Sequence, residues 1–271
     1  MALTHGSLFS GIGGIDLGLE WAGFETSWQV EINPFSNKIL EKRWPNVQRF
    51  LDVNSVGKHN LKPVSLISGG FPCQDISIAG KRAGLAGERS GLWYQYARVI
   101  SELRPSWVLI ENVPRLYSTE VDTVLDHMEK EGYACWPLVL GAWSIGATHK
   151  RNRAWILCHT NGDDGIGNDM GGRWTLLQTE VGALAQAQQK GQGRLHELVP
   201  RDGVSGVDTY AGIVRETHGV PGRVDRLRAL GNSVVPQIPK LIGDFVTAYE
   251  NVKSATIPSC ESNTTTLTAT S

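Results

Sequence analysis

The chain has 271 residues, 41% of them hydrophobic, and a formal net charge of -1. This length and apolar content are enough for one large domain with a small inserted lobe. The near-zero charge disfavours a histone-like binder held by a global positive field, but it leaves room for an enzyme with local basic contacts.

The remaining bulk features point to a reducing, intracellular setting. The four cysteines have no spacing typical of a metal site, and we expect no bound metal. No N-terminal segment resembles a signal peptide, and no apolar run reaches the length of a membrane span. We therefore expect the thiols to stay reduced.

Short apolar runs alternate with longer amphipathic stretches over residues 1–158. The runs predict strands at Leu3–Phe9, Ser27–Glu31, Val64–Ser68, Trp107–Glu111, Trp136–Leu140 and Ala154–Cys158. The stretches predict helices at Gly14–Ala22, Pro34–Trp44, Leu92–Leu103 and Glu120–Glu131. Strands separated by helices indicate an α/β domain with a doubly wound, mostly parallel sheet.

The pattern breaks at His159. Residues 159–221 are rich in Gly, Asn, Gln and Asp, and fit a loop, an irregular recognition lobe or a partly disordered segment. Order returns over residues 222–253, where a helix at Val234–Tyr249 is expected to close the first domain. The Ser/Thr-rich tail, residues 254–271, is predicted to be disordered.

A glycine-rich turn, Phe9–Gly14, falls where the first strand passes into a helix. Glycines there let backbone N–H groups approach a ligand, although a tight turn also needs glycine for structural reasons alone. Glu31 ends the second predicted strand, where an acid commonly holds ribose hydroxyls. Asp52 follows a third segment and could accept from an adenine amino group. The alternative is that both acids are ordinary solvated residues at strand ends.

Cys73 and Glu111 each follow or close an apolar strand. Because parallel strands end at one edge of a sheet, we expect both residues near the glycine turn. A cysteine and an acid at such an edge suit one reaction, the methylation of cytosine at carbon 5. A thiolate that adds to carbon 6 of cytosine makes carbon 5 able to take a methyl group, and an acid at ring nitrogen 3 favours the addition. Burial is expected to raise the pKa of Glu111 and keep it protonated. The alternatives are an inert core thiol, and a helix cap or structural salt bridge for the acid.

These segments resemble the motifs of the cytosine-5 DNA methyltransferase family, particularly the short forms of phages and prophages. The resemblance covers residues 3–158 and 222–249, through the segments Phe9–Gly14, Gly69–Gln74, Asp75–Leu92, Glu111–Val113, Thr148–Arg153 and Gly231–Pro236. It implies a Rossmann-like class I S-adenosylmethionine-dependent methyltransferase sheet with a small, irregular target-recognition lobe. It also implies methyl transfer to carbon 5 of a flipped-out cytosine in DNA, through a covalent Cys73 adduct at carbon 6.

The resemblance assigns roles to individual residues. Cys73 is the implied nucleophile and Glu111 the acid, while Arg151 and Arg153 hold the extruded cytosine and a nearby phosphate. The implied cofactor pocket consists of Phe9, Gly11, Ile12, Gly13, Gly14, Glu31, Ile32, Asp52, Gly70, Pro72, Leu92, Asn232 and Ser233. The implied DNA contacts are Gln74, Ser77, Arg89, Arg151 and Arg153.

The resemblance further implies a monomer that acts on double-stranded DNA in the cytoplasm of a bacterial or phage-infected cell. Its role in restriction–modification or in phage self-protection stays open. Two alternatives also stay open: a tRNA cytosine-5 methyltransferase of the same architecture, and a degenerate, non-catalytic DNA-binding protein. The segment Arg226–Asn232 favours DNA, and the intact Cys73, Glu111 and Arg153 favour an enzyme.

The chain departs from the family pattern at several places. Ser7 stands where the family usually has Asp, and His149 replaces the usual Gln. Residues 159–221 are short for a recognition region and lack a convincing copy of its Arg-rich anchoring motif, for which Arg223, Arg226 and Arg228 are the candidate substitutes. We therefore expect a short or relaxed target sequence, weak activity, or dependence on a partner.

Overall fold

The computed structural model describes residues 2–72, 91–145, 151–160 and 223–256. Seven strands in these ranges form one sheet: β1 (Thr4–Leu8), β2 (Glu25–Val30), β3 (Gln48–Phe50), β4 (Leu66–Gly69), β5 (Trp107–Asn112), β6 (Tyr133–Leu140) and β7 (Arg153–Thr160). The α-helices are α1 (Gly14–Trp21), α2 (Pro34–Arg43), α3 (Leu92–Leu103), α4 (Leu116–Thr119), α5 (Val121–Lys130), α8 (Arg223–Asn232) and α9 (Gln237–Thr256). Two 3-10 helices, η1 (Val53–Ser55) and η3 (Ala142–Ile145), complete the described elements.

The strand order is β3-β2-β1-β4-β5-β7-β6. The first five strands in this order pair in parallel, and β7 runs antiparallel between β5 and β6. The predicted doubly wound, mostly parallel sheet is therefore confirmed. The chain proceeds from β1 toward β3 on one side and from β4 toward β5 on the other, so a crevice opens beyond the carboxyl ends of β1 and β4.

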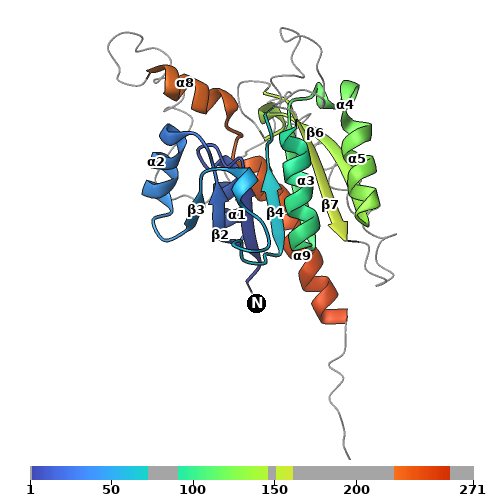
Figure 1. The fold of residues 1–271 in the computed structure, drawn as a ribbon. Coiled ribbons are helices and arrows are strands. Elements are labelled where there is room, and N and C mark those ends of the chain that lie inside the picture. The colour runs from blue at the N-terminus through green and yellow to red at the C-terminus, as the bar shows by residue number, and fades with distance from the viewer. Residues whose placement is uncertain (1, 73–90, 146–150, 161–222, 257–271) are drawn as a thin grey trace, which may run out of the picture.

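Helices cover both faces of this sheet (Figure 1). Alternate residues of β4 and β5 serve the two faces, as the pleat of a strand requires. Ile67 and Val108 belong to the apolar cluster beneath α3 and α5, whereas Leu66 and Trp107 belong to the cluster beneath α1 and α9. These central strands are buried on both sides, which explains why they read as unbroken apolar runs in the sequence.

The last helix packs against the first. A Cβ atom on Gly18, buried in α1, would lie 2.2 Å from the carbonyl oxygen of Pro236 and 2.6 Å from the ring of Pro239. Thr247 of α9 donates to the carbonyl oxygen of Ala22 at 3.2 Å. Only a glycine at position 18 allows this approach, so α1 and α9 join the two ends of the described chain.

A buried carboxylate connects β1, α1 and β2. Asp16, in the first turn of α1, accepts from Ser7 Oγ at 3.2 Å and from Gln29 Nε2 at 2.9 Å. All three side chains are buried, and this burial raises the pKa of Asp16 to about 6. Ser7, which stands where the family usually has Asp, thus donates a hydrogen bond to a carboxylate from α1.

The predicted elements exist, and their ends differ for local reasons. The closing helix begins at Gln237 rather than Val234, because a residue that precedes proline, here Val235, avoids helical backbone. The same helix continues to Thr256, inside the predicted tail, and Ser254 Oγ donates to Glu250 O four residues earlier. Strand β7 likewise extends to Thr160, beyond the predicted break. Of the predicted recognition region (159–221), residues 161–221 lie outside the described residues, as does the rest of the tail (257–271).

No helix in the described part of the chain is both long enough and apolar enough to cross a membrane.

We predict that Gly18→Ala lowers the free energy of unfolding. Overpacking costs about 1–3 kcal/mol in a packed interior, and an approach of 2.2 Å to backbone places this site at the upper end. Alanine is a better helix former than glycine, which offsets about 1 kcal/mol of this cost. The free energy of unfolding, measured in urea, should therefore fall by about 2 kcal/mol. Glu20→Ala, on the exposed face of α1, is the matched control and should change stability by less than about 0.5 kcal/mol. Equal or greater stability of Gly18→Ala would contradict the described packing.

A second prediction concerns Asp16 and pH. Its pKa is raised from 3.8 to about 6 in the folded protein. Its contribution to stability is therefore fully present below pH 3.8 and is lost as the pH rises through about 6. Asp16→Asn should remove this loss, so the variant should gain unfolding free energy relative to the wild type as the pH rises from 4.5 to 7.5. Asp122→Asn, an exposed acid in the first turn of α5, should leave the pH profile unchanged. Parallel pH profiles for Asp16→Asn and the wild type would refute the assignment.

Candidate active site

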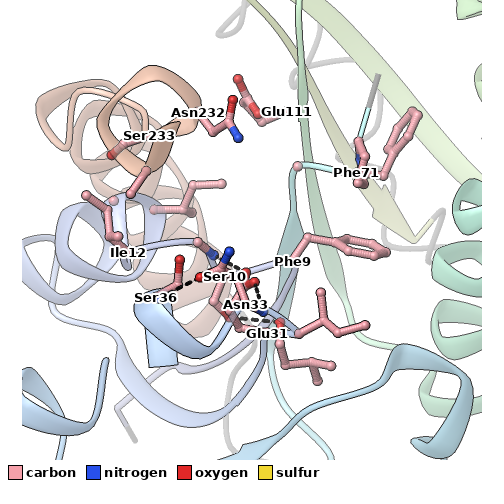
Figure 2. Close-up of a pocket in the computed structure, with 18 of the residues that line it drawn as sticks. Phe9, Ser10, Ile12, Glu31, Asn33, Ser36, Phe71, Glu111, Asn232 and Ser233 are labelled. Atoms are coloured by element: carbon pink, nitrogen blue, oxygen red, sulfur yellow. Dashed lines mark hydrogen bonds between the residues drawn. The ribbon is translucent and has the colours of Figure 1, made fainter. Parts of the chain in front are cut away.

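A cavity of about 360 Å³ lies beyond the carboxyl ends of β1 to β5 (Figure 2). Its walls come from the turns that follow these strands, and a segment of the returning chain, residues 229–234, completes it. Its volume falls in the range of small-molecule pockets, roughly 300–1,000 Å³. It occupies the place where the order of the parallel strands reverses, which is the usual ligand position in such sheets.

The glycine turn and Glu31 form one end of the cavity. Glu31 Oε2 accepts from the backbone N of Gly11, and Glu31 Oε1 accepts from that of Asn33, both at 2.7 Å. These bonds fix the carboxylate, and each oxygen keeps a further lone pair for a ligand hydroxyl. A Cβ atom on Gly11 would meet nothing within 4 Å, so the turn faces open space. Glu31 is therefore placed to hold vicinal hydroxyls.

Two apolar side chains flank this end. Ile32 and Leu51 line the cavity although 74% and 64% of their surfaces are exposed. A planar base placed against them would bury that surface. Asp52 lies beside them, and its Oδ1 accepts from the backbone and side-chain nitrogens of Asn54 at 2.9 and 2.8 Å. Asp52 thus caps η1 in addition to lining the cavity, so this residue has a structural role and is also placed where it could contact a ligand.

All the residues predicted to bind the cofactor line the cavity except Gly13. Gly13 has a φ of 82°, and a Cβ atom there would lie 2.4 Å from the ring of Trp44. This glycine is therefore needed for the turn and its packing, which is the structural alternative that the sequence allowed.

The cavity is also lined by residues that the sequence motifs did not predict. Asn33 caps α2, because its Oδ1 accepts from the backbone N of Phe35 and of Ser36 at 2.9 and 3.0 Å. The pair Asn33–Pro34 is a typical helix start and could have signalled this role. The other lining residues that were missed include Ser10, Ser36, Leu51, Asn54, Phe71, Asp225, Ala229 and Val234.

Glu111 lies toward the opposite end of the cavity from Glu31 (Figure 2). Strands β4 and β5 are parallel neighbours, as the sequence argument required. A Cβ atom on Gly70, just past β4, would lie 2.5 Å from Glu111 Oε2. Asn112 Nδ2 donates to Phe71 O at 3.2 Å and so connects the same turn to β5. The turn that leads to Cys73 therefore passes directly over the acid.

Glu111 is held by an arginine. Its Oε1 lies 3.0 Å from Arg153 Nε, and the two side chains are only 11% and 16% exposed. Burial raises the pKa of Glu111 to about 7, while Arg153 and Arg151 oppose this rise. The predicted increase in pKa is confirmed, and the acid also makes the ion pair that was its structural alternative. At neutral pH both the protonated and the ionised forms are populated.

The predicted base and DNA contacts are only partly described. The guanidinium of Arg151 donates to Leu230 O at 2.9 Å and to Gly231 O at 2.8 Å. Arg153 Nη2 approaches Gly231 O at 3.4 Å. Residues Cys73, Gln74, Ser77, Arg89 and His149 lie outside the described ranges.

No metal-binding cluster is present among the residues that the structure describes, since no three His, Cys, Asp or Glu side chains lie together suitably.

The sequence is similar to those of known proteins. The Type II methyltransferase M2.BsuMI of Bacillus subtilis is 38% identical over 56% of this chain and 40% of its own length. The Type II methyltransferase M.CviJI of Paramecium bursaria Chlorella virus IL3A is 36% identical over 55% of this chain and 41% of its own length. The chain thus spans about two fifths of the length of each relative.

The fold is also shared with solved structures. The S. pombe Dnmt2 methyltransferase matches with a TM-score of 0.52 and 21% identity, over 59% of this chain and 52% of that one. This likeness shows the fold, in agreement with the class I methyltransferase sheet expected from the sequence. The family model for C-5 cytosine-specific DNA methylases matches residues 3–196. Since that match spans more than half of the sequence, the chain belongs to the C-5 cytosine-specific DNA methylase family.

Proposed function

We propose that this chain transfers a methyl group from S-adenosylmethionine to carbon 5 of cytosine in DNA. The observation that carries the proposal is the single cavity that contains Glu31 and the glycine turn toward one end and Glu111 with Arg153 toward the other. A donor held at the first end would face a base held at the second. Family membership supports both the cofactor and the substrate class.

The residues present fit S-adenosylmethionine. Glu31 is fixed by two backbone N–H groups and can accept the ribose hydroxyls, while Ile32 and Leu51 offer an apolar seat for adenine. Asn232 and Ser233 close the cavity from the returning chain. When bound, the cofactor supplies a methyl group made electrophilic by its sulfonium. The cavity volume of about 360 Å³ suits a ligand of this size.

On the base side, the proposed nucleophile is Cys73, which follows Gly70 by three residues. One cytosine leaves the DNA stack and enters beside Glu111. The Cys73 thiolate forms a bond to carbon 6, and Glu111 donates to ring nitrogen 3 as negative charge develops there. Carbon 5 then takes the methyl group. A base or water then takes the proton from carbon 5, the carbon 5–carbon 6 double bond forms again as the bond from carbon 6 to sulfur breaks, and the Cys73 thiolate leaves.

Arg153 orients the acid in this scheme. Its Nε holds Glu111 Oε1 at 3.0 Å, while Gly70 packs against Oε2. Burial favours the protonated acid that the reaction needs, and Arg153 favours the ionised one. We therefore place Arg153 in the base pocket as the partner of Glu111.

We extend the proposal to the domain organisation. Residues 1–158 form the catalytic and cofactor-binding part, and residues 222–253 return to complete it. The contacts of α9 with α1, and of residues 229–234 with the cavity, support this return. Residues 159–221 are proposed to recognise the target sequence.

The first test is production of 5-methylcytosine in cells. Plasmid DNA from a host without its own cytosine methylation should contain 5-methylcytosine, measured by mass spectrometry, when the chain is expressed. Cys73→Ala should abolish the signal, because the adduct at carbon 6 cannot form, yet it should still bind S-adenosylmethionine. Cys135→Ala, in β6 and away from the cavity lining, is the matched control and should stay active.

Normal methylation by Cys73→Ala would remove the nucleophile assignment. Methylation of tRNA but not of DNA would replace the substrate class. DNA binding without any methylation, by wild type and variant alike, would favour the non-catalytic alternative.

The second test is the pH profile of kcat/KM. The free enzyme must carry protonated Glu111, so the rate should fall as the pH rises through about 7, the pKa of that acid. Loss of a general acid typically costs about 10²–10⁴-fold, and Glu111→Gln should fall in this range and lose the descending limb near neutrality. Glu129→Gln, an exposed acid on α5, should keep both the rate and the profile. An unchanged descending limb in Glu111→Gln would assign that limb to another group.

A further inference from the structure

Arg151 contacts the backbone carbonyl groups at the end of α8. Its Nη2 lies 2.9 Å from Leu230 O and 2.8 Å from Gly231 O, and it also contacts Ser233 O. The first two carbonyls belong to the last turn of α8, where helix carbonyls lack intrahelical partners and the helix dipole is negative. A guanidinium is well suited to such an end, because it presents several donors in one plane.

The segment that Arg151 contacts is a wall of the cofactor cavity. Ala229, Asn232, Ser233 and Val234 all line that cavity. The other side of the wall packs on the glycine turn, since a Cβ atom on Gly14 would lie 2.9 Å from Ser233 Oγ and 3.0 Å from Val234 O. Residues 229–234, which we call the returning wall, are thus held between Gly14 and Arg151.

The backbone at Arg151 supports a fixed role. Its φ is 34°, in the left-handed region, which costs a non-glycine residue about 1–2 kcal/mol. Residues keep such a conformation where their surroundings determine it, and such positions cluster at functional sites. The carbonyl contacts supply these surroundings at Arg151.

Arg151 and Arg153 have different main partners. Arg153 Nε pairs with Glu111 at 3.0 Å, at the base end of the cavity. Arg151, two residues earlier, contacts the returning wall at Leu230 and Gly231. Arg153 Nη2 also approaches Gly231 O at 3.4 Å, so the acid and the wall are joined through neighbouring side chains.

We propose that Arg151 is a positioning residue that fastens the returning wall over the cofactor cavity, and that it does not contact a DNA phosphate. This replaces the role that the family resemblance implied for Arg151. The proposal rests on the proposed function, because it assumes that S-adenosylmethionine occupies the cavity. It predicts that loss of Arg151 weakens cofactor binding in the absence of DNA and leaves the electrostatic part of DNA binding intact.

The test uses Arg151→Gln and Arg151→Lys in the full chain, with folding checked by circular dichroism. Calorimetry without DNA should show S-adenosylmethionine bound at least tenfold more weakly by Arg151→Gln, with an intermediate effect in Arg151→Lys, which keeps the charge but loses the planar donors. Hydrogen exchange should show reduced protection of residues 229–234 in both variants. Arg43→Gln, an exposed arginine that pairs with Glu20, is the matched control and should change neither readout.

The salt dependence of DNA binding separates the two roles of Arg151. A phosphate contact contributes about 0.9 to the slope of log K against log salt for a duplex. With a fluorescent 30-base-pair duplex, the slope should be the same for wild type, Arg151→Gln and Arg43→Gln. A slope lowered by about one in Arg151→Gln overturns the proposal, whatever happens to cofactor affinity.

Unchanged cofactor affinity in Arg151→Gln also overturns the proposal. If Arg151→Gln does not fold, Arg151→Lys decides both readouts. A wild-type chain that binds no S-adenosylmethionine would refute the proposed function itself and the role of Arg151 with it. That outcome is recognised before any variant is compared.

Discussion

The parallel pairing of β1 with β4 determines where the described groups of the candidate site lie. Since the chain leaves these neighbouring strands toward opposite sides of the sheet, a crevice opens beyond their carboxyl ends. Glu31 reaches the crevice from β2, and Glu111 reaches it from β5. Neither acid touches the other, yet both open onto one cavity because the sheet presents its strand ends at one edge. Buried central strands make this arrangement costly to distort.

Within that frame, Glu111 is subject to two opposing influences. Burial under Gly70 favours the neutral acid, and the ion pair with Arg153 favours the charged one, so its pKa settles at about 7. A fully apolar pocket would keep the acid protonated but would not orient it. A stronger ion pair would orient the acid but hold it ionised. A pKa near 7 would let this acid donate a proton to a base at neutral pH, as the proposed reaction requires, and the ion pair fixes the direction in which the carboxyl group points.

Much of this arrangement could be predicted from local sequence, and the failures have physical causes. Apolar runs predicted the central strands because strands buried on both faces need them, and the turns after those strands supplied most of the predicted residues that line the cavity. β3 spans only Gln48–Phe50, too short for an alternating pattern. Gly13 packs on Trp44 and does not line the cavity, and a sequence cannot separate a glycine required by packing from one required by a ligand. The contacts of Arg151 span 79 and 80 residues, and no local pattern reports such partners.

Because of these long-range contacts, the cavity depends on segments from both ends of the described chain. The glycine turn belongs to the first residues, whereas the wall that rests on Gly14 belongs to residues 229–234. Further contacts hold the returning segment, because the start of α9 packs against Gly18 of α1 and Arg151 donates to the end of α8. The cavity therefore forms only when the returning segment has docked. A ligand that binds only the docked state stabilises it by mass action, so cofactor binding and closure of the fold must strengthen each other. Gly231 of the same wall contacts Arg153, which pairs with Glu111, so the returning segment and this acid share one arginine as a partner.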